Sequence, residues 1–263
     1  MSPKVHTAVG LSWHGAYLNR ARYSRRRCTG IPDCTIGARA TRCIVGTYRP
    51  PDATDLIDIL RAMSTDPPAS NAVLDAIEAR RSIGRVTPDR PTRAQVEAVL
   101  NAAIYAPNHH NTHPWRFAVL AGDARRAAGE FLAASLDRRA TRAGAAVDPS
   151  VRANESAKFL RAPVVIVVAV EPTEGEPLDE EIAAGAAAVQ NMLLAAHSLG
   201  LATVWRTGEA VRDPHAAADF GFASQAVIIG FVYLGTPDQN YPPKPRPARP
   251  ELPTITRWDG WVD

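Results

Sequence analysis

The stretch "YAPNHHNTHPWRF" places three histidines, His109, His110 and His113, within five residues. An imidazole can ligate a metal, transfer a proton near neutral pH, or line a binding pocket. A metal site would need these imidazoles to converge, usually with a carboxylate or an open water position. Which of the three roles applies depends on the local geometry of the chain.

Prolines bracket this stretch, and we call residues 105–114 the histidine loop. Pro107 closes the helix expected before it, and Pro114 precedes the strand expected after it. His109 and His113 are four residues apart, a spacing that aligns side chains on a helix but has no fixed geometry in a loop. The loop contains no Asp or Glu to orient a metal-bound imidazole. We therefore predict no metal site here.

Two further clusters offer cations and hydroxyls. "RRS", residues 80–82, places two guanidinium groups and a hydroxyl at the end of an expected helix. "WRTG", residues 205–208, places a guanidinium, a hydroxyl and backbone N–H groups at the end of a short strand, where pockets form. Both suit a phosphate or the carbonyl edge of a ring, although a solvated helix end and a β-turn would contain the same residues.

Several familiar catalytic signatures are absent. The sequence has no Gly-x-Gly-x-x-Gly after a strand and no Gly-x4-Gly-Lys-Ser/Thr, so it supports neither a Rossmann nor a P-loop nucleotide site. It has no Gly-x-Ser-x-Gly, and its three cysteines, Cys28, Cys34 and Cys43, precede the patterned part of the chain. A cysteine–histidine mechanism in that part is therefore excluded.

Two helices must position the first clusters. Ser70 or Asn71 can cap a helix with Val73, Leu74 and Ile77 on one stripe, which ends at "RRS". A second helix opens at the capping box formed by Thr92 and Gln95 and runs to the histidine loop.

The remaining pattern alternates strands with helices. We expect strands at Arg116–Leu120, Pro163–Val170, Thr203–Trp205 and Ala226–Leu234, and helices at 122–141, 180–198 and 214–220. The run 163–170 is apolar on both faces, which is typical of a central strand. The helix at 180–198 has small residues nearly all round, which favours burial on more than one side, including against a second subunit. The expected class is α+β, a central mixed sheet flanked by helices.

The N-terminal segment differs from the rest. Residues 1–50 hold nine Lys or Arg and one acid, a charge of +8, which leaves −5 for the remainder of a chain of net charge +3. We predict that residues 1–62 form a disordered basic leader or an over-extended start, and that 63–263 form the domain, with a proline-rich, extended C-terminal arm from Tyr241. The longest apolar run is too short to span a membrane, and a body without cysteine suits the cytoplasm.

In this order, "RRS", "APN" and "NTHPWRFAVL", the central strand, the Ala-rich helix, "TVWRTG" and "IIGFVYLGTP" resemble the FMN-dependent nitroreductase family. The likeness is to compact bacterial NAD(P)H nitroreductases and covers residues 70–238. It implies the nitroreductase-like fold of an intertwined homodimer with FMN at the interface. It also implies an enzyme that uses NADH or NADPH to reduce nitroaromatics, quinones or similar acceptors by ping-pong hydride transfer. No catalytic side chain is then expected, because the hydride moves at flavin N5.

The resemblance also implies a set of site residues. From one subunit the FMN contacts would be Arg80, Arg81, Ser82, Trp205, Arg206, Thr207 and Gly208. From the histidine loop of the other subunit they would be Tyr105, His109 and His113, with His110 facing solvent. A nicotinamide-nucleotide segment would match Ala196, His197, Ser198, Leu199, Gly200 and Leu201. Two residues depart from many relatives: Gly84 stands for Lys or Arg, where Arg85 could substitute, and His113 stands for Gln.

Two other functions remain open on sequence alone. A specialised flavoenzyme of the same fold, such as a dehydrogenase, a dehalogenase or a flavin-fragmenting enzyme, would share all of these motifs. A nucleic-acid-binding protein could use the basic leader, whose first 50 residues carry +8. The acidic body and the lack of a known nucleic-acid-binding motif argue against it, so we expect no nucleic-acid partner.

Overall fold

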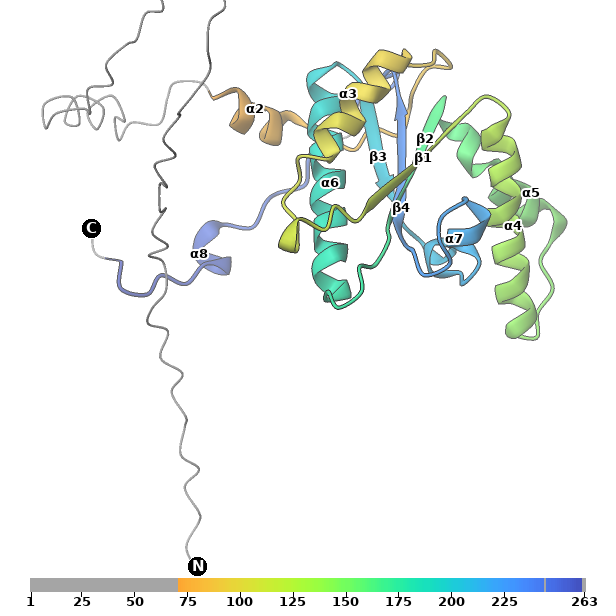
Figure 1. The fold of residues 1–263 in the computed structure, drawn as a ribbon. Helices are drawn as coiled ribbons and strands as arrows, with labels where there is room; N and C mark the ends of the chain where they lie inside the picture. Colours follow the sequence, from red (N-terminus) through yellow and green to blue (C-terminus); the bar gives the residue numbers. More distant parts are fainter. Residues whose placement is uncertain (1–70, 244, 262–263) are drawn as a thin grey trace, which may run out of the picture. The chain divides into compact units, whose positions relative to one another are not determined.

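The computed structural model describes residues 71–243 and 245–261 (Figure 1). The predicted basic leader, residues 1–62, lies outside the described residues. Among those residues, no helix is both long enough and apolar enough to cross a membrane.

One sheet holds the described strands together, in the order β1-β2-β4-β3 (Figure 1). The strands are β1 (Trp115–Ala121), β2 (Val164–Val170), β3 (Ala202–Arg206) and β4 (Val227–Gly235). Each begins and ends within one residue of the bounds predicted from the apolar pattern. The positions of the strands are therefore confirmed.

The direction of the strands corrects the prediction of a mixed sheet. All three neighbouring pairs, β1 with β2, β2 with β4 and β4 with β3, are antiparallel. The strands β2 and β3, which a helix connects, do run parallel to each other, but β4 lies between them and is antiparallel to both. The only parallel pairing among the described residues is an isolated bridge between Ser82 and Thr203.

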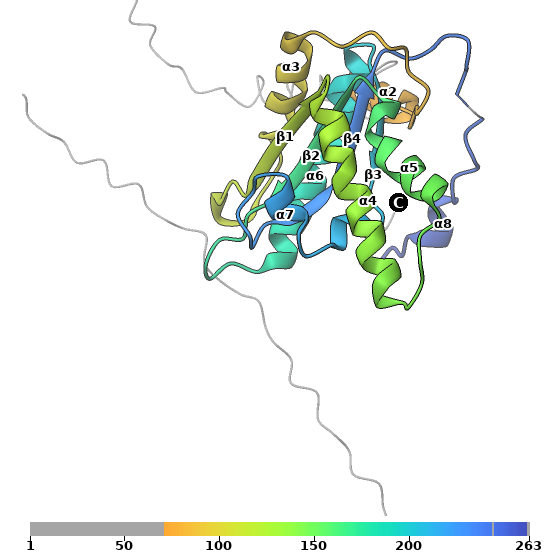
Figure 2. The same cartoon turned by 90° about the vertical axis from the view of Figure 1, so that its right-hand side faces the viewer.

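The helices cover both faces of this sheet. They are α2 (Ala72–Ala79), α3 (Arg93–Ala103), α4 (Ala124–Arg142), α5 (Pro149–Ser156), α6 (Leu178–Ser198), α7 (Ala216–Asp219) and α8 (Leu252–Ile255). Short 3-10 turns lie at His109–Asn111, Ala157–Arg161 and Glu209–Arg212. In Figures 1 and 2, α3 and α6 lie on one face of the sheet, and α4, α5 and α7 lie on the other.

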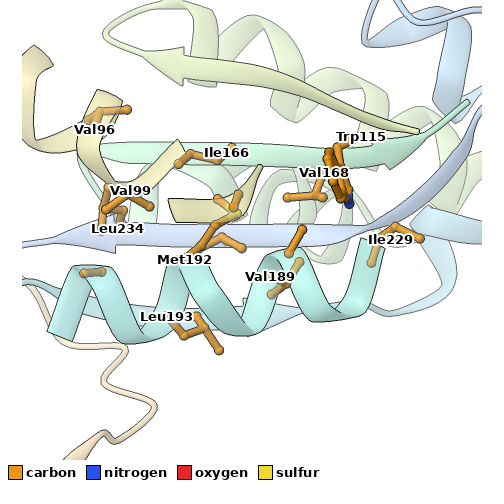
Figure 3. Packing of buried hydrophobic residues seen from close by; sticks show 14 of the residues in the cluster. Val96, Val99, Trp115, Ile166, Val168, Val189, Met192, Leu193, Ile229 and Leu234 are labelled. Carbon is orange, nitrogen blue, oxygen red and sulfur yellow. The ribbon is translucent and has the colours of Figure 1, made fainter. Parts of the chain in front are cut away.

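The strand β2 is buried along its whole length, which confirms that it is central. Its alternate residues enter two different cores. Ile166 and Val168 pack in the cluster beneath α3 and α6 (Figure 3), whereas Val165 and Val167 pack with Phe159 and neighbours on the α4 side. A strand with apolar residues on both faces requires such a layer on each side.

The predicted caps explain where the helices begin and end. The Asn71 side chain accepts hydrogen bonds from Val73 N and Leu74 N at the start of α2. Thr92 and Gln95 form the expected capping box at the start of α3. At the end of α6, Gly200 has φ +71°, a conformation that glycine adopts at low cost. The start of α2, the start of α3 and the end of α6 are thus each fixed by capping residues next to them in the sequence.

The C-terminal arm is extended as predicted except at α8, but it is not free of the domain. The Arg246 guanidinium donates hydrogen bonds to the carbonyl oxygens of Glu78 and Arg80, the latter at 3.1 Å. The arm is thus extended and is also tied to the end of α2 by these hydrogen bonds. Proline richness indicated the extended backbone, but it carried no information about an arginine that reaches back to the end of α2.

A buried ion pair joins α4 to the segment before α7. Arg138 Nη2 lies 3.0 Å from Asp213 Oδ2, and the Asp213 side chain is only 1% exposed. Asp213 also accepts a hydrogen bond from His215 N at 3.0 Å. Burial by itself would raise the pKa of Asp213, but the bond from His215 and the Arg138 charge hold it below its ordinary value.

We expect Asp213→Asn to lower the free energy of unfolding by about 1–3 kcal/mol, because it leaves Arg138 without its counter-ion. The folded-state pKa of Asp213 is depressed, so its stabilising contribution is complete above the unfolded-state pKa of about 3.9. It is lost as the pH falls through the lower folded-state pKa. Urea unfolding of both proteins across this pH range should show the difference shrinking on acidification. A difference that stays constant down to about pH 2 would contradict the assignment.

Candidate functional site

The "RRS" segment lies beside β3 because the chain turns at the end of α2. Arg80 has an extended backbone with ψ 134°, which ends the helix. Ser82 then forms its bridge with Thr203, and Ile83 N donates to Thr203 O at 2.9 Å. Since β3 ends at Arg206, one edge strand aligns both basic clusters.

A cavity of about 1100 Å³ opens between this segment and the C-terminal arm, and we call it the arginine cleft. Its cationic lining consists of Arg80, Arg81, Arg85, Arg161, Arg206, Arg246 and Arg249. Ser82 contributes a hydroxyl, and Ile83, Val86 and Tyr241 contribute apolar surface. Among the described residues that line it there is no Asp or Glu. A concave site with an apolar wall and several guanidinium groups suits a planar molecule that carries phosphate.

The positive charge of the arginine cleft is not fully compensated within the chain. Burial lowers the pKa of Arg246, and the neighbouring charges of Arg81, Arg249 and Arg80 lower it further. Arg80 Nη1 is buried and has no hydrogen-bond partner among the described residues. A buried donor of this kind costs free energy until an acceptor reaches it. The cleft therefore favours an anionic ligand.

One aromatic ring and one glycine lie beside the Arg206 guanidinium. Its guanidinium carbon lies 5.6 Å from the centre of the Tyr233 ring, and burial raises the pKa of Tyr233 to about 12, so this ring stays neutral. A Cβ atom at Gly84 would lie 3.6 Å from Arg206 Nη2, an ordinary contact, so a long cation there would compete with Arg206 for space. Arg85 instead lies over Tyr241 at 5.2 Å and lines the cleft.

The other residues of "WRTG" shape the end of β3. Trp205 Nε1 donates to Ile229 O at 3.4 Å across the sheet. Its indole lies against Gly230, where an added Cβ would come within 2.3 Å of Trp205 Nε1. Gly208 has φ +105°, and Thr207 and Gly208 lie outside the lining of the cleft. The structure thus brings Arg80, Arg81, Ser82 and Arg206 together in the arginine cleft. Trp205, Thr207 and Gly208 are neighbours of Arg206 in the sequence but do not line the cleft.

The histidine loop lies against the start of α6. His109 Nδ1 is 2.6 Å from Glu180 Oε2, and His110 Nδ1 is 3.1 Å from Glu176 Oε1. The His113 ring packs 5.7 Å from that of Trp115, and Tyr105 is 82% exposed. The backbone has positive φ at His110, Asn111 and His113, which is uncommon for residues other than glycine.

Sequence reasoning missed Glu176 and Glu180. They follow the histidine loop by more than sixty positions, and only the packing of α6 beside the loop brings them to the imidazoles. The prediction that His110 faces solvent holds in part, because its side chain is 67% exposed but lies against Glu176.

The arginine cleft and the histidine loop lie toward opposite ends of α6. The loop contacts residues at the start of this helix, whereas Ser82 pairs with Thr203, five residues after its end. With 21 residues, α6 is about 31 Å long. The predicted contacts from the two regions are therefore not assembled around one cavity within a single chain.

The predicted nicotinamide-nucleotide segment forms the end of α6. Ala196 and Leu201 are buried in the core, and Leu201 N donates to Ala196 O at 2.8 Å to close the helix. Ser198, Leu199 and Gly200 are exposed. His197 is partly exposed, so residues 197–200 are the part of this segment accessible to a ligand.

The fold and the cleft together define an α+β protein whose antiparallel sheet is covered by helices on both faces and has an arginine-lined cavity beside its edge strand. The sequence model of the Nitroreductase family matches residues 77–236, which hold the whole sheet. The chain therefore belongs to the Nitroreductase family of oxidoreductases.

Its relatives include YdjA from Escherichia coli K12, a proposed NAD(P)H nitroreductase. The two are 35% identical over 170 residues, which cover 62% of this chain and 89% of YdjA. YfhC from Bacillus subtilis, also a proposed NAD(P)H nitroreductase, is 27% identical over 63% of this chain and 84% of its own length. A proposed nitroreductase from Desulfovibrio desulfuricans, solved in complex with FMN, is 29% identical with a TM-score of 0.55, covering 74% of this chain and all of that one.

We expect inorganic phosphate to raise the thermal midpoint of the protein by binding the arginine cleft. Arg80→Gln should weaken phosphate affinity about tenfold, because a charge-assisted hydrogen bond is worth about 1.5–3 kcal/mol. Arg93→Gln is the matched control, since Arg93 is 92% exposed and its partner Glu97 lies on the same helix. Thermal melts across a phosphate series would measure the difference. Equal phosphate dependence in the two variants would place the anion elsewhere.

Proposed function

We propose that this protein is an FMN-dependent oxidoreductase that oxidises NADH or NADPH and reduces a nitroaromatic, a quinone or a similar small acceptor. The observation that carries this proposal is the arginine cleft, with the unpartnered buried Arg80 Nη1, in a chain of the Nitroreductase family. A relative of the same fold and 29% identity was solved with FMN, which supports this choice of anion.

Within the cleft, the chain supplies binding and electrostatic tuning. Arg80, Arg81 and Ser82 would hold the phosphate and the polar edge of the ring, and Arg206 would approach the ring from the end of β3. When bound, FMN would take a hydride at N5 from the reduced nicotinamide and pass it to the acceptor in a second half-reaction. A guanidinium near the ring stabilises negative charge there, so no acid or base side chain is required.

The nicotinamide nucleotide and the acceptor would use the same open face in turn. Residues 197–200 at the end of α6 are the part of the predicted nucleotide segment available for contact. The excess of arginines beyond those that one phosphate can engage gives the cleft capacity for further phosphate groups of NADH or NADPH.

A homodimer with FMN at the interface would complete the site. Tyr105, His109 and His113 lie near the far end of α6, so they would serve the cofactor of the other subunit. Exposed apolar residues support a second subunit: Val73, Leu74 and Ile77 on α2 are 64%, 54% and 46% exposed. An apolar stripe that stays largely exposed among the described residues is typical of an interface.

We expect the purified protein to be yellow, or to become yellow with added FMN, and to be bleached by NADH or NADPH under anaerobic conditions. Arg80→Gln should lower FMN affinity by about tenfold, while Arg93→Gln leaves it unchanged. Absorption spectra and fluorescence titration with FMN would measure both. A colourless protein that takes up no added FMN would refute the proposal.

Mixing two variants tests the shared site. Arg80→Gln and His109→Ala should each weaken FMN retention alone, because each damages one half of every site. A mixed dimer contains one site with the native Arg80 of one subunit and the native loop of the other, so mixing should restore FMN retention in part. FMN bound after unfolding and refolding the mixture is the readout. No recovery above the single variants would mean that the two residues do not serve one site across an interface.

A further inference from the structure

We propose that His109, His110 and Glu176 form a binding site for a divalent transition-metal ion of the zinc class, with Glu180 orienting His109. This inference goes beyond the proposed flavin chemistry and does not depend on it. The sequence argued against a metal because the histidine loop contains no carboxylate. The fold removes that objection by placing the start of α6 beside the loop.

The distances match the spacing of ligands around one small ion. Metal–nitrogen and metal–oxygen bonds of about 2.0–2.1 Å in a tetrahedron separate neighbouring ligand atoms by about 3.3 Å. Glu176 Oε1 lies 3.1 Å from His110 Nδ1, and Glu176 Oε2 lies 3.8 Å from His109 Nε2. One ligand atom from each of the three residues falls within 4.8 Å of the others. A small closure would bring all three onto one ion.

The second nitrogen of His109 has the partner that a metal-bound imidazole normally has. Its Nδ1 lies 2.6 Å from Glu180 Oε2, so an Nδ1–H donated to this carboxylate leaves Nε2 as the lone-pair atom toward Glu176. Carboxylates in this position fix the tautomer and raise the basicity of the ligating nitrogen.

The loop backbone is held in the conformation that this cluster needs. His110 and Asn111 have φ of +47° and +57°, the left-handed region that non-glycine residues adopt at a cost. This turn brings the ring centres of His109 and His110 to 3.8 Å, with the rings tilted by 41°, on the side of the loop that faces Glu176. An ion bound there would offset part of the cost.

Two imidazoles and one carboxylate select the class of ion. Imidazole favours Zn²⁺ and its transition-metal neighbours, whereas Mg²⁺ prefers oxygen ligands alone. Three protein ligands also leave one position for water or for another ligand. Binding would fasten the histidine loop to α6, so its consequence for this protein is the rigidity of that loop.

The test is Co²⁺ binding to the full chain, because Co²⁺ reports tetrahedral coordination by visible absorption and Zn²⁺ displaces it. Thiolates would compete, so every protein carries Cys28→Ser, Cys34→Ser and Cys43→Ser. We expect one Co²⁺ per chain, displaced by Zn²⁺ but not by Mg²⁺. Glu176→Gln, His109→Ala and His110→Ala should each abolish the absorption band.

Two further variants separate a metal site from a general effect of the loop. Glu180→Gln should keep the band but weaken affinity on the order of tenfold, as expected for a residue that acts through His109. His113→Ala is the matched control, because it removes an imidazole of the same loop that does not belong to the cluster, and it should bind Co²⁺ as the parent does. Far-UV circular dichroism checks that each variant is folded. If an alanine variant does not fold, Glu176→Gln still tests the site, because it keeps the shape of the side chain.

The inference is overturned if the parent shows no tetrahedral Co²⁺ band, or if Glu176→Gln binds Co²⁺ as tightly as the parent. Either result would mean that the cluster is only a network of ion pairs. FMN content, measured on the parent and on Glu176→Gln, reports separately on the proposed flavin function, because Glu176 has no part in the proposed FMN contacts.

Discussion

The burial of β2 on both faces is the constraint on which the rest of this structure depends. A strand of seven apolar residues cannot face water, so the chain must supply a helical layer on each side. One layer is α6 with α3, and the other is α4 with its neighbours. Once α6 lies along the sheet, the residues before it and after it are held at its opposite ends. The histidine loop and the arginine cleft are therefore separated.

The two regions at the ends of α6 are opposite in electrostatic character. The arginine cleft gathers cations with no acidic residue among its described lining, whereas the histidine loop has two carboxylates facing its imidazoles. Neither arrangement maximises stability, because uncompensated like charges repel and positive φ strains the loop. Features that cost stability persist where a ligand offsets the cost, which supports the proposal of a ligand at each region. The net charge of the chain reveals neither the gathered cations of the arginine cleft nor the carboxylates beside the histidine loop.

Much of this fold could be predicted from local pattern. The strand bounds, the capping box at Thr92 and the glycine that ends α6 all follow from rules that act within a few residues. The direction of the strands did not follow, because the position of β4 between β2 and β3 is a long-range pairing that no local pattern encodes. In the same way, the two basic clusters could be recognised in the sequence, but the arm that covers them could not. Proline content indicates an extended chain and says nothing about where Arg246 binds.

The histidine loop shows how far composition can mislead. Three imidazoles in five residues look like a metal site when they are counted, and the lack of a nearby acid in sequence then argues against one. Both inferences treat sequence distance as if it were spatial distance. The contact between Glu176 and His110 spans 66 positions, so the carboxylate that the proposed site requires comes from the turn before α6 and not from the loop. The loop is therefore better understood as one half of a contact, whose other half is set by the same helix that the buried strand requires.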